Sequence, residues 1–328
     1  MSNIRKFVFG VPLDLTSATR HGFPEQESRK PGLEKIGEAV TIGYHRALEL
    51  ADTSQIEASL AKDVERGLLS FAIEGAAMGF MVLDTALVWN RSDHIGKWLK
   101  EESGKRYRHL IIIGAGLALG RIRFSTAKAV ARLDPVVGWF IVDGYGFLRG
   151  FLDWKRFFER RERDKSFTGY GAHVFDQGLG RALWFVDNAN VKRVADRIAS
   201  FDEDRRGDLW SGVGIAACYA GNADQDDLTA LRVAAGKYAP ELALGAMGAA
   251  QVRVVAGNIV DHTELASRTL TGLSPTENAT LASTVERDVL ADAANAPVSL
   301  HELYRQRVIA HFAKPDSDIR SPRAELRP

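Results

Sequence analysis

The chain has 328 residues, of which 45% are hydrophobic and 26% charged, a composition typical of a globular protein and not of a disordered one. Its 43 basic and 42 acidic residues give a formal net charge of +1, so no global field would draw it to nucleic acid or to an anionic membrane. The single cysteine, Cys218, excludes an intramolecular disulfide and a cysteine-rich metal site.

The start of the chain has too short an apolar run for a secretion signal or a membrane span, so we expect a cytoplasmic protein without membrane insertion. Residues 1–33 contain Pro12, Pro24 and Pro31, which predicts an extended arm laid over the body of the protein. After Pro31, apolar residues at three- and four-residue spacings predict helical segments. These cover residues 33–52 and 55–89, with a capping break between them.

Three later segments begin with residues that typically cap helices. Ser274 is followed by Pro275 and, three residues on, by Glu277, which predicts a helix start with a capping box. Asn190 and the run 222–227 predict two further helix starts. The pattern of the whole chain therefore predicts an all-α fold, a helical bundle of about a dozen helices.

We expect one helical domain over residues 34–313 and a flexible, polar tail over 314–328. Residues 40–150 and 175–272 share a weak similarity in the order of three short blocks, which predicts two pseudo-symmetric halves with a cavity at their interface. Chance similarity among alanine- and glycine-rich helices is the alternative.

Small residues recur at tight spacing in the apolar segments 75–79, 114–116, 212–214 and 245–248. Glycine in a helix costs about 1 kcal/mol relative to alanine, so its repeated use needs a reason. Close approach of neighbouring helices is the interpretation that we favour, and room for a flat apolar ligand is the alternative.

The run His109–Gly120 offers a different interpretation, because an apolar stretch followed by glycines is typical of a strand that leads into a phosphate-binding loop. Asp143, at the end of a second apolar run, would then hold a ribose. This nucleotide-dependent oxidoreductase remains an alternative function. The pattern departs from the usual glycine spacing, however, and no alternation of strands and helices surrounds it.

Asp224, Asp226 and Asp227 match the Asp-x-Asp-Asp pattern of class II terpene cyclases, in which Asp226 would protonate an alkene. The same carboxylates are weak candidates for a Mg²⁺ site. Acidic residues at a predicted helix start more often stay in water and favour the helix dipole. The histidines show no metal-binding spacing, so we expect no cofactor.

Polar residues embedded in apolar runs are the main candidates for a site, because burying them costs free energy unless they are paired. The candidate catalytic residues are Glu74, Asp143, Asp176 and Arg181. The candidate substrate-binding residues are Tyr145, Trp184, Trp210, Ser211, His262 and Glu264. The alternative is that buried pairs of arginine and carboxylate only tie helices together.

The stretches 71–79, 142–147, 175–185, 208–214 and 262–266 resemble a bacterial family of unknown function whose members are often encoded beside enediyne-type polyketide synthases. The family offers no motif with an assigned catalytic role. The resemblance implies a role in natural-product biosynthesis, next to partner proteins of that process and on a long, unsaturated, hydrophobic intermediate.

These considerations predict a cofactor-independent enzyme that cyclises or isomerises a hydrophobic polyene chain, a polyketide or an isoprenoid. A buried carboxylic acid, Glu74 or Asp143, would transfer the proton. The hydrophobic small molecule would lie in a cavity between helices. The alternative from another class is a non-catalytic protein that carries or sequesters such a ligand.

Overall fold

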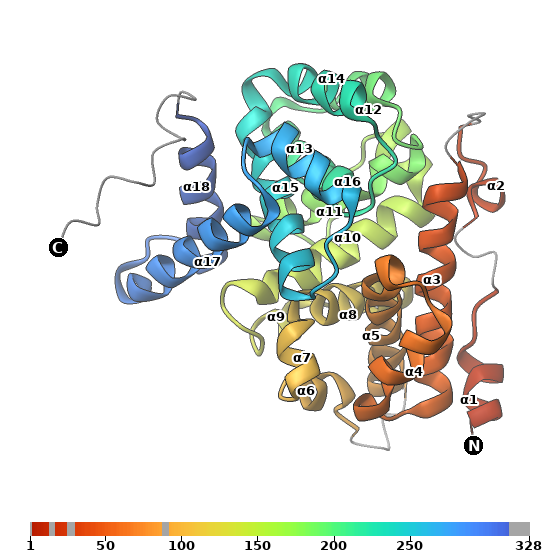
Figure 1. The fold of residues 1–328 in the computed structure, drawn as a ribbon. Helices are drawn as coiled ribbons and strands as arrows, with labels where there is room; N and C mark the ends of the chain where they lie inside the picture. Colours follow the sequence, from red (N-terminus) through yellow and green to blue (C-terminus); the bar gives the residue numbers. More distant parts are fainter. Residues whose placement is uncertain (1, 13–16, 25–29, 87–91, 315–328) are drawn as a thin grey trace.

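The computed structural model describes residues 2–12, 17–24, 30–86 and 92–314, and Figure 1 shows them as helices joined by turns and loops. No β-strand occurs in these ranges. The predicted all-α fold is therefore confirmed. The tail predicted over 314–328 lies outside the described residues except for its first residue.

The N-terminal segment is helical where an extended arm was predicted. α1 (Ser2–Phe9) and α2 (Ala18–His21) lie in it, because the run Ser2–Phe9 contains neither proline nor glycine and Pro12 comes only after the helix has ended. The segment does lie on the body of the protein. Lys6 Nζ is 2.6 Å from Glu49 Oε1, and the Tyr44 hydroxyl donates to the carbonyl of Phe9 at 2.7 Å.

The helical segment predicted over residues 55–89 is divided in two. α3 (Lys30–Leu50) is followed by α4 (Ile56–Asp63) and then α5 (Leu69–Ala86). The chain leaves α4 at Val64, whose backbone is extended at φ −120° and ψ 133°. Residues 87–89 of the prediction lie outside the described part of the chain.

The remaining helices follow in chain order and include several short ones. They are α6 (His94–Trp98), α7 (Glu102–Arg106), α8 (Arg108–Ile122), α9 (Ala127–Val130), α10 (Phe140–Leu152), α11 (Tyr170–Val186), α12 (Val191–Ala199), α13 (Glu203–Tyr219), α14 (Gln225–Ala235), α15 (Ala239–Val255), α16 (Asp261–Thr271), α17 (Pro275–Ala291) and α18 (Leu300–Phe312). The predicted caps are confirmed. Ser274 and Glu277 form a capping box on α17, and Asn190 Oδ1 accepts from the Arg193 amide at the start of α12.

The long helices α3, α5, α8, α10, α11, α13 and α15 pack against one another in sequence order. Glycines allow this packing at every step. A Cβ atom added to Gly75 in α5 would overlap the carbonyl oxygen of Val40 in α3, and one added to Gly43 would overlap that of Ala72. Similar crossings join the later helices, at Gly114, Gly116, Gly144, Gly146, Gly178, Gly180, Gly212, Gly214 and Gly245. Close helix approach is thus the reason for the glycines.

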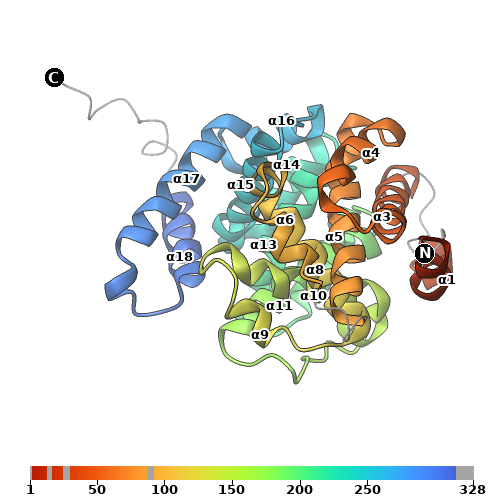
Figure 2. The ribbon, with the colours of Figure 1, turned by 90° about the horizontal axis from the view of Figure 1, so that it is seen from below.

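Long side chains connect the last helix of this series to the turn before α5, its second helix, so that α5 to α15 surround a common interior. Arg253 in α15 donates to the carbonyl of Gly67, just before α5, at 2.9 Å and to that of Tyr219 at 2.6 Å. Arg66 donates to the carbonyl of Gly257 at 3.0 Å. α1–α3 cover one end of the molecule and α17–α18 the opposite end, as both views show (Figures 1 and 2).

The glycine contacts do not reproduce the register of the predicted internal duplication. In that register Gly43 corresponds to Gly178 and Gly75 to Gly214. Gly43 faces the helix that follows its own in the series, whereas Gly178 faces α10, the helix before its own. Gly75 faces the preceding helix and Gly214 the following one. The duplication stays a prediction.

One described segment, Arg66–Thr85, is long and apolar enough to cross a membrane by length and composition. Of its most apolar window, 72% is buried inside the protein. It contains α5, which packs between α3 and α8 in the interior. Burial in the core accounts for its apolar character.

We predict that Gly75→Ala lowers the free energy of unfolding by about 3 kcal/mol or more, because the added methyl group meets a backbone carbonyl that cannot move alone. Gly248→Ala in α15 is the matched control, since nothing lies within 4 Å of a Cβ there. It should be neutral or stabilising by up to about 1 kcal/mol. Urea denaturation of both variants would measure this, and equal effects would contradict the role given to the glycine crossings.

Candidate functional site

Three charged side chains from three helices meet in the interior. Arg181 in α11 pairs with Asp143 in α10 through Nη1 and lies 3.5 Å from Glu74 Oε1 in α5 through Nη2. All three are buried, with 3% of Glu74, 0% of Asp143 and 7% of Arg181 exposed. The guanidinium also lies 5.0 Å from the centre of the Phe147 ring. The predicted residues Glu74, Asp143 and Arg181 therefore form one cluster.

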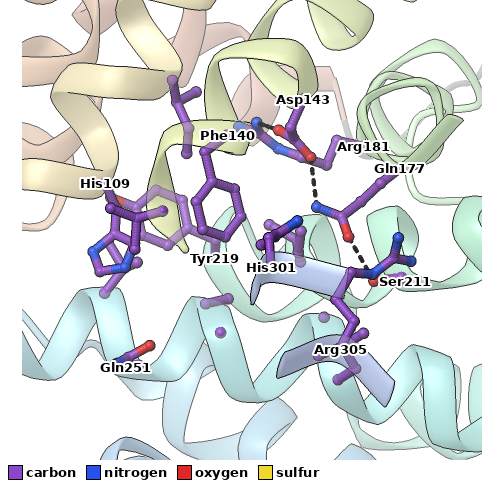
Figure 3. A pocket seen from close by; sticks show the side chains of 18 of the residues that line it. His109, Phe140, Asp143, Gln177, Arg181, Ser211, Tyr219, Gln251, His301 and Arg305 are labelled. Atoms are coloured by element: carbon purple, nitrogen blue, oxygen red, sulfur yellow. Dashed lines mark hydrogen bonds and ion pairs between the residues drawn. The ribbon is translucent and has the colours of Figure 1, made fainter. Parts of the chain in front are cut away.

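The amide group of Gln177 and the hydroxyl group of Ser211 extend this cluster from α11 to α13. Gln177 Nε2 donates to Asp143 Oδ2 at 2.9 Å, and the Ser211 hydroxyl in α13 donates to Gln177 Oε1 at 3.1 Å. Figure 3 shows this chain of hydrogen bonds along one side of a pocket. Ser211 was predicted to bind substrate, but here it orients Gln177.

The glycine crossings place this polar chain. The carbonyl oxygens of Glu74, Asp143, Gln177 and Ser211 are the atoms that Gly114, Gly178, Gly212 and Gly245 of the neighbouring helices approach most closely. Each crossing thus brings the backbone of one polar residue against the next helix. Because the helices are so close at these crossings, the polar side chains of one helix can reach those of the next. This closeness allows hydrogen bonds to join them into a row.

The carboxyl group of Glu74 has fewer polar contacts than that of Asp143. Asp143 receives hydrogen bonds on both oxygens, from Arg181 and from Gln177. Glu74 has only the 3.5 Å contact with Arg181 among the described residues. Burial raises the pKa of Glu74 to about 7, Arg181 opposes the rise and the charge of Asp143 adds to it. Glu74 can therefore both give and accept a proton near neutral pH.

Two apolar pockets meet at this cluster. The C-terminal pocket is lined by helices α5, α8, α10, α11, α13, α15, α17 and α18, and the N-terminal pocket by α3, α5, α8, α10, α11 and α13. Four residues line both pockets: Glu74, Arg181, Ile215 and Tyr219. The cavity volumes are about 60 Å³ for the C-terminal pocket and about 90 Å³ for the N-terminal pocket, smaller than typical ligand sites, so a ligand would have to widen them.

The walls of both pockets are mainly aliphatic and aromatic. Ile113, Phe140 and Leu244 line the C-terminal pocket, and Met78 and Phe147 line the N-terminal one. Both spaces are narrow, so a slender chain fits them better than a broad ring system. A charged cluster between two apolar pockets is an arrangement that can act on the middle of an extended apolar molecule.

Sequence reasoning missed several polar residues of the C-terminal pocket, among them His109 in α8 and Gln251 in α15. Burial, together with the charge of Arg108, lowers the pKa of His109 to about 3, so the ring is neutral at physiological pH. The signal was present for both, since each is a polar residue within an apolar run. His109 was instead taken as the start of a strand.

Asp176, a predicted catalytic residue, lies in a separate ion pair. Its two oxygens accept from Arg205 Nε at 2.7 Å and Nη2 at 2.6 Å, and Arg205 also donates to the carbonyl of Arg161 at 3.0 Å. Asp176 lines neither pocket. The alternative interpretation, a buried pair that ties helices together, therefore describes this residue.

The predicted substrate-binding residues other than Ser211 lie outside the two pockets. The Trp184 indole donates to the carbonyl of Gly221 at 2.9 Å, and His262 Nε2 lies 3.0 Å from the carbonyl of Tyr219. Trp210 is buried, with 3% exposed, and lines neither pocket. Glu264 pairs with Arg268 at 2.7 Å on the surface, and Tyr145 lines a different, outer hollow. The structure therefore does not bring these residues to the two pockets.

Asp224, Asp226 and Asp227 lie at the start of α14, where Asp224 and Asp227 form a capping box. Asp226 is exposed in the first turn of that helix and lines neither pocket. The described residues contain no group of three His, Cys, Asp or Glu side chains that could hold a metal ion. The helix-start interpretation describes these carboxylates better than the terpene-cyclase pattern does.

The strand and phosphate loop considered for His109–Gly120 are wrong. This run lies in α8, and Asp143 lies in α10. Gly114 and Gly116 contact backbone atoms of α5 and α10 and leave no loop for a phosphate. The apolar run resembles a strand in sequence because the helix is buried on all sides.

The fold and the site define an all-helical protein in which a charged cluster lies between two apolar pockets. The chain belongs to the family described as a protein of unknown function, DUF1702, whose profile matches residues 1–312. Neither the curated proteins nor the solved structures contain a significant match to the chain.

We predict that Glu74→Gln removes a pH-dependent part of the stability. The folded protein holds this proton with a pKa of about 7 against 4.5 for a free glutamate, so it binds more protons than the unfolded chain between these values. The free energy of unfolding of the parent protein should then fall by about 3 kcal/mol between pH 4.5 and 7 from this group alone. Urea denaturation across pH measures it, and a constant difference between variant and parent would contradict it.

We predict that Asp143→Asn lowers the free energy of unfolding by about 3 kcal/mol or more, because it leaves Arg181 buried without its closest partner. Glu264→Gln at the surface is the matched control and should cost less than about 1 kcal/mol. Thermal or urea unfolding at pH 8 compares them. A small effect of Asp143→Asn would show that Asp143 does not hold the cluster together.

Proposed function

We propose that the protein is an enzyme of natural-product biosynthesis that cyclises or isomerises a hydrophobic polyene without a cofactor, with Glu74 as the group that transfers the proton. The observation that carries the proposal is the position of Glu74, a loosely held carboxyl group at the junction of two apolar pockets. Isomerising or cyclising a polyene requires a proton to be added at one carbon or removed from another, in a site from which water is excluded.

Arg181 supports this chemistry by its place beside Glu74. Burial lowers the pKa of the guanidinium, but Asp143 and Glu74 outweigh this effect and raise it above its usual value, so the arginine stays charged. It therefore stabilises the Glu74 carboxylate once the proton has left. Asp143 and Gln177 hold the arginine in place and act as positioning residues.

The shape and lining of the pockets support a slender apolar substrate. Their walls offer apolar contacts along an extended chain, while the charged groups converge only near its middle. The resemblance to proteins encoded beside enediyne-type polyketide synthases supports a long, unsaturated polyketide over an isoprenoid.

A carrier that shields a reactive product is the second candidate. The observation that favours it is the ion pair between Glu74 and Arg181, because such a pair can serve only to join helices and take no part in chemistry. The two candidates differ in whether bound ligand exchanges protons with water.

We predict that the protein catalyses exchange of deuterium from D₂O into its ligand and that Glu74→Gln slows this exchange about 100-fold or more. The ligand is extracted from purified protein, identified by mass spectrometry and incubated with parent or variant protein in D₂O. Glu264→Gln serves as the matched surface control and should exchange at the parent rate. Exchange that Glu74→Gln does not slow would contradict the role of Glu74, and a ligand that is bound without exchange would favour the carrier.

A further inference from the structure

The C-terminal pocket contains two polar side chains, His109 and Gln251, that have no hydrogen-bond partner among the described residues. Each residue is 6% exposed, yet neither has a polar atom among the fully enclosed side-chain atoms that lack a partner, so their polar atoms are open to the space of the pocket. A ligand that displaces water from such a group has to replace its hydrogen bonds. These two side chains can therefore donate to and accept from a polar group of a bound molecule.

The two residues lie apart from the charged cluster. Figure 3 shows His109 and Gln251 on one side of the pocket, and Asp143, Gln177 and Arg181 on the other. The remaining lining includes the apolar residues Ile113, Phe140 and Val252 and, from α17 and α18, the polar residues Glu286, His301 and Arg305. The C-terminal pocket therefore offers a ligand two separate groups of polar side chains, with Phe140 and His301 between them.

The end formed by His109 and Gln251 is electrically neutral. A neutral imidazole has one donor and one acceptor nitrogen, and the Gln251 amide has both kinds of atom. The charged residues here are already paired, because Arg108 Nη2 lies 2.6 Å from Glu286 Oε1 and Arg305 of the same pocket pairs with Asp208. A carboxylate bound here would lose its hydration without gaining a free cation. A hydroxyl or a carbonyl group would satisfy both side chains without that cost.

We propose that His109 and Gln251 bind an uncharged oxygen group, a hydroxyl or a carbonyl, at one end of a slender unsaturated ligand whose apolar body extends past Phe140 toward Glu74. The inference deepens the proposed function and rests on it for the direction of the chain. Recognition of the oxygen group fixes which carbons of the chain lie beside Glu74. The two residues are therefore binding and positioning residues.

Three fluorescent probes with the same tetraene chain test this inference: parinaryl alcohol, methyl parinarate and parinaric acid. Their affinities are measured by fluorescence titration at pH 8, where the acid is ionised. We expect the alcohol and the methyl ester to bind at least about tenfold more tightly than the acid, which lacks a counterion here. Equal or tighter binding of the acid, or no binding of any probe, would overturn the proposal.

His109→Leu and Gln251→Leu should each lower the affinity for parinaryl alcohol about tenfold, which corresponds to the loss of one hydrogen bond in a desolvated site. Both variants should keep or raise the melting temperature, because each removes an unpaired polar group from the interior. Gln306→Leu on the exposed side of α18 is the matched control and should bind all probes as the parent does. Unchanged affinity for the alcohol in both pocket variants would sink the inference.

These measurements separate the inference from the proposed function. Probe selectivity depends only on which groups face the pocket, whereas deuterium exchange depends on proton transfer by Glu74. Selective binding without exchange would leave the oxygen-binding end intact and reject the enzyme. Exchange with unselective binding would leave the enzyme intact and reject the oxygen-binding end.

Discussion

The structure depends on the close approach of helix backbones at glycines. Each long helix from α3 to α15 contacts the next where a glycine meets a carbonyl oxygen, and any larger residue would push the two apart. The same crossings fix the polar chain, because the carbonyls of Glu74, Asp143, Gln177 and Ser211 are the atoms approached. The packing and the site therefore share one constraint.

The buried charges show an asymmetry that has chemical consequences. Arg181 is closest to Asp143, whose other oxygen is taken by Gln177, while Glu74 is left with one longer contact. A fully bonded carboxylate has little reason to exchange its proton, whereas a loosely paired one in an apolar site titrates near neutral pH. A pair that only joined helices would not need this second carboxyl group.

The charged cluster differs from a simple structural ion pair because it borders two apolar pockets. A buried pair in solid packing would be a structural feature, but here apolar space lies on both sides of it. His109 and Gln251 add a neutral polar end to one of these spaces. The proposed recognition of an oxygenated apolar chain rests on these three features: charge in the middle, apolar walls and a neutral end.

Local spacing and residue type are enough to predict the helical class, the caps at Ser274 and Asn190, and the polar residues in apolar runs. Which of these polar residues meet depends on the tertiary structure. Glu74 and Arg181 lie far apart in the chain and converge through glycine crossings, while Asp176, which lies in the same helix as Arg181, pairs with Arg205 instead. Residue type is local, but which residues become partners depends on how the helices cross, and local spacing does not contain that information.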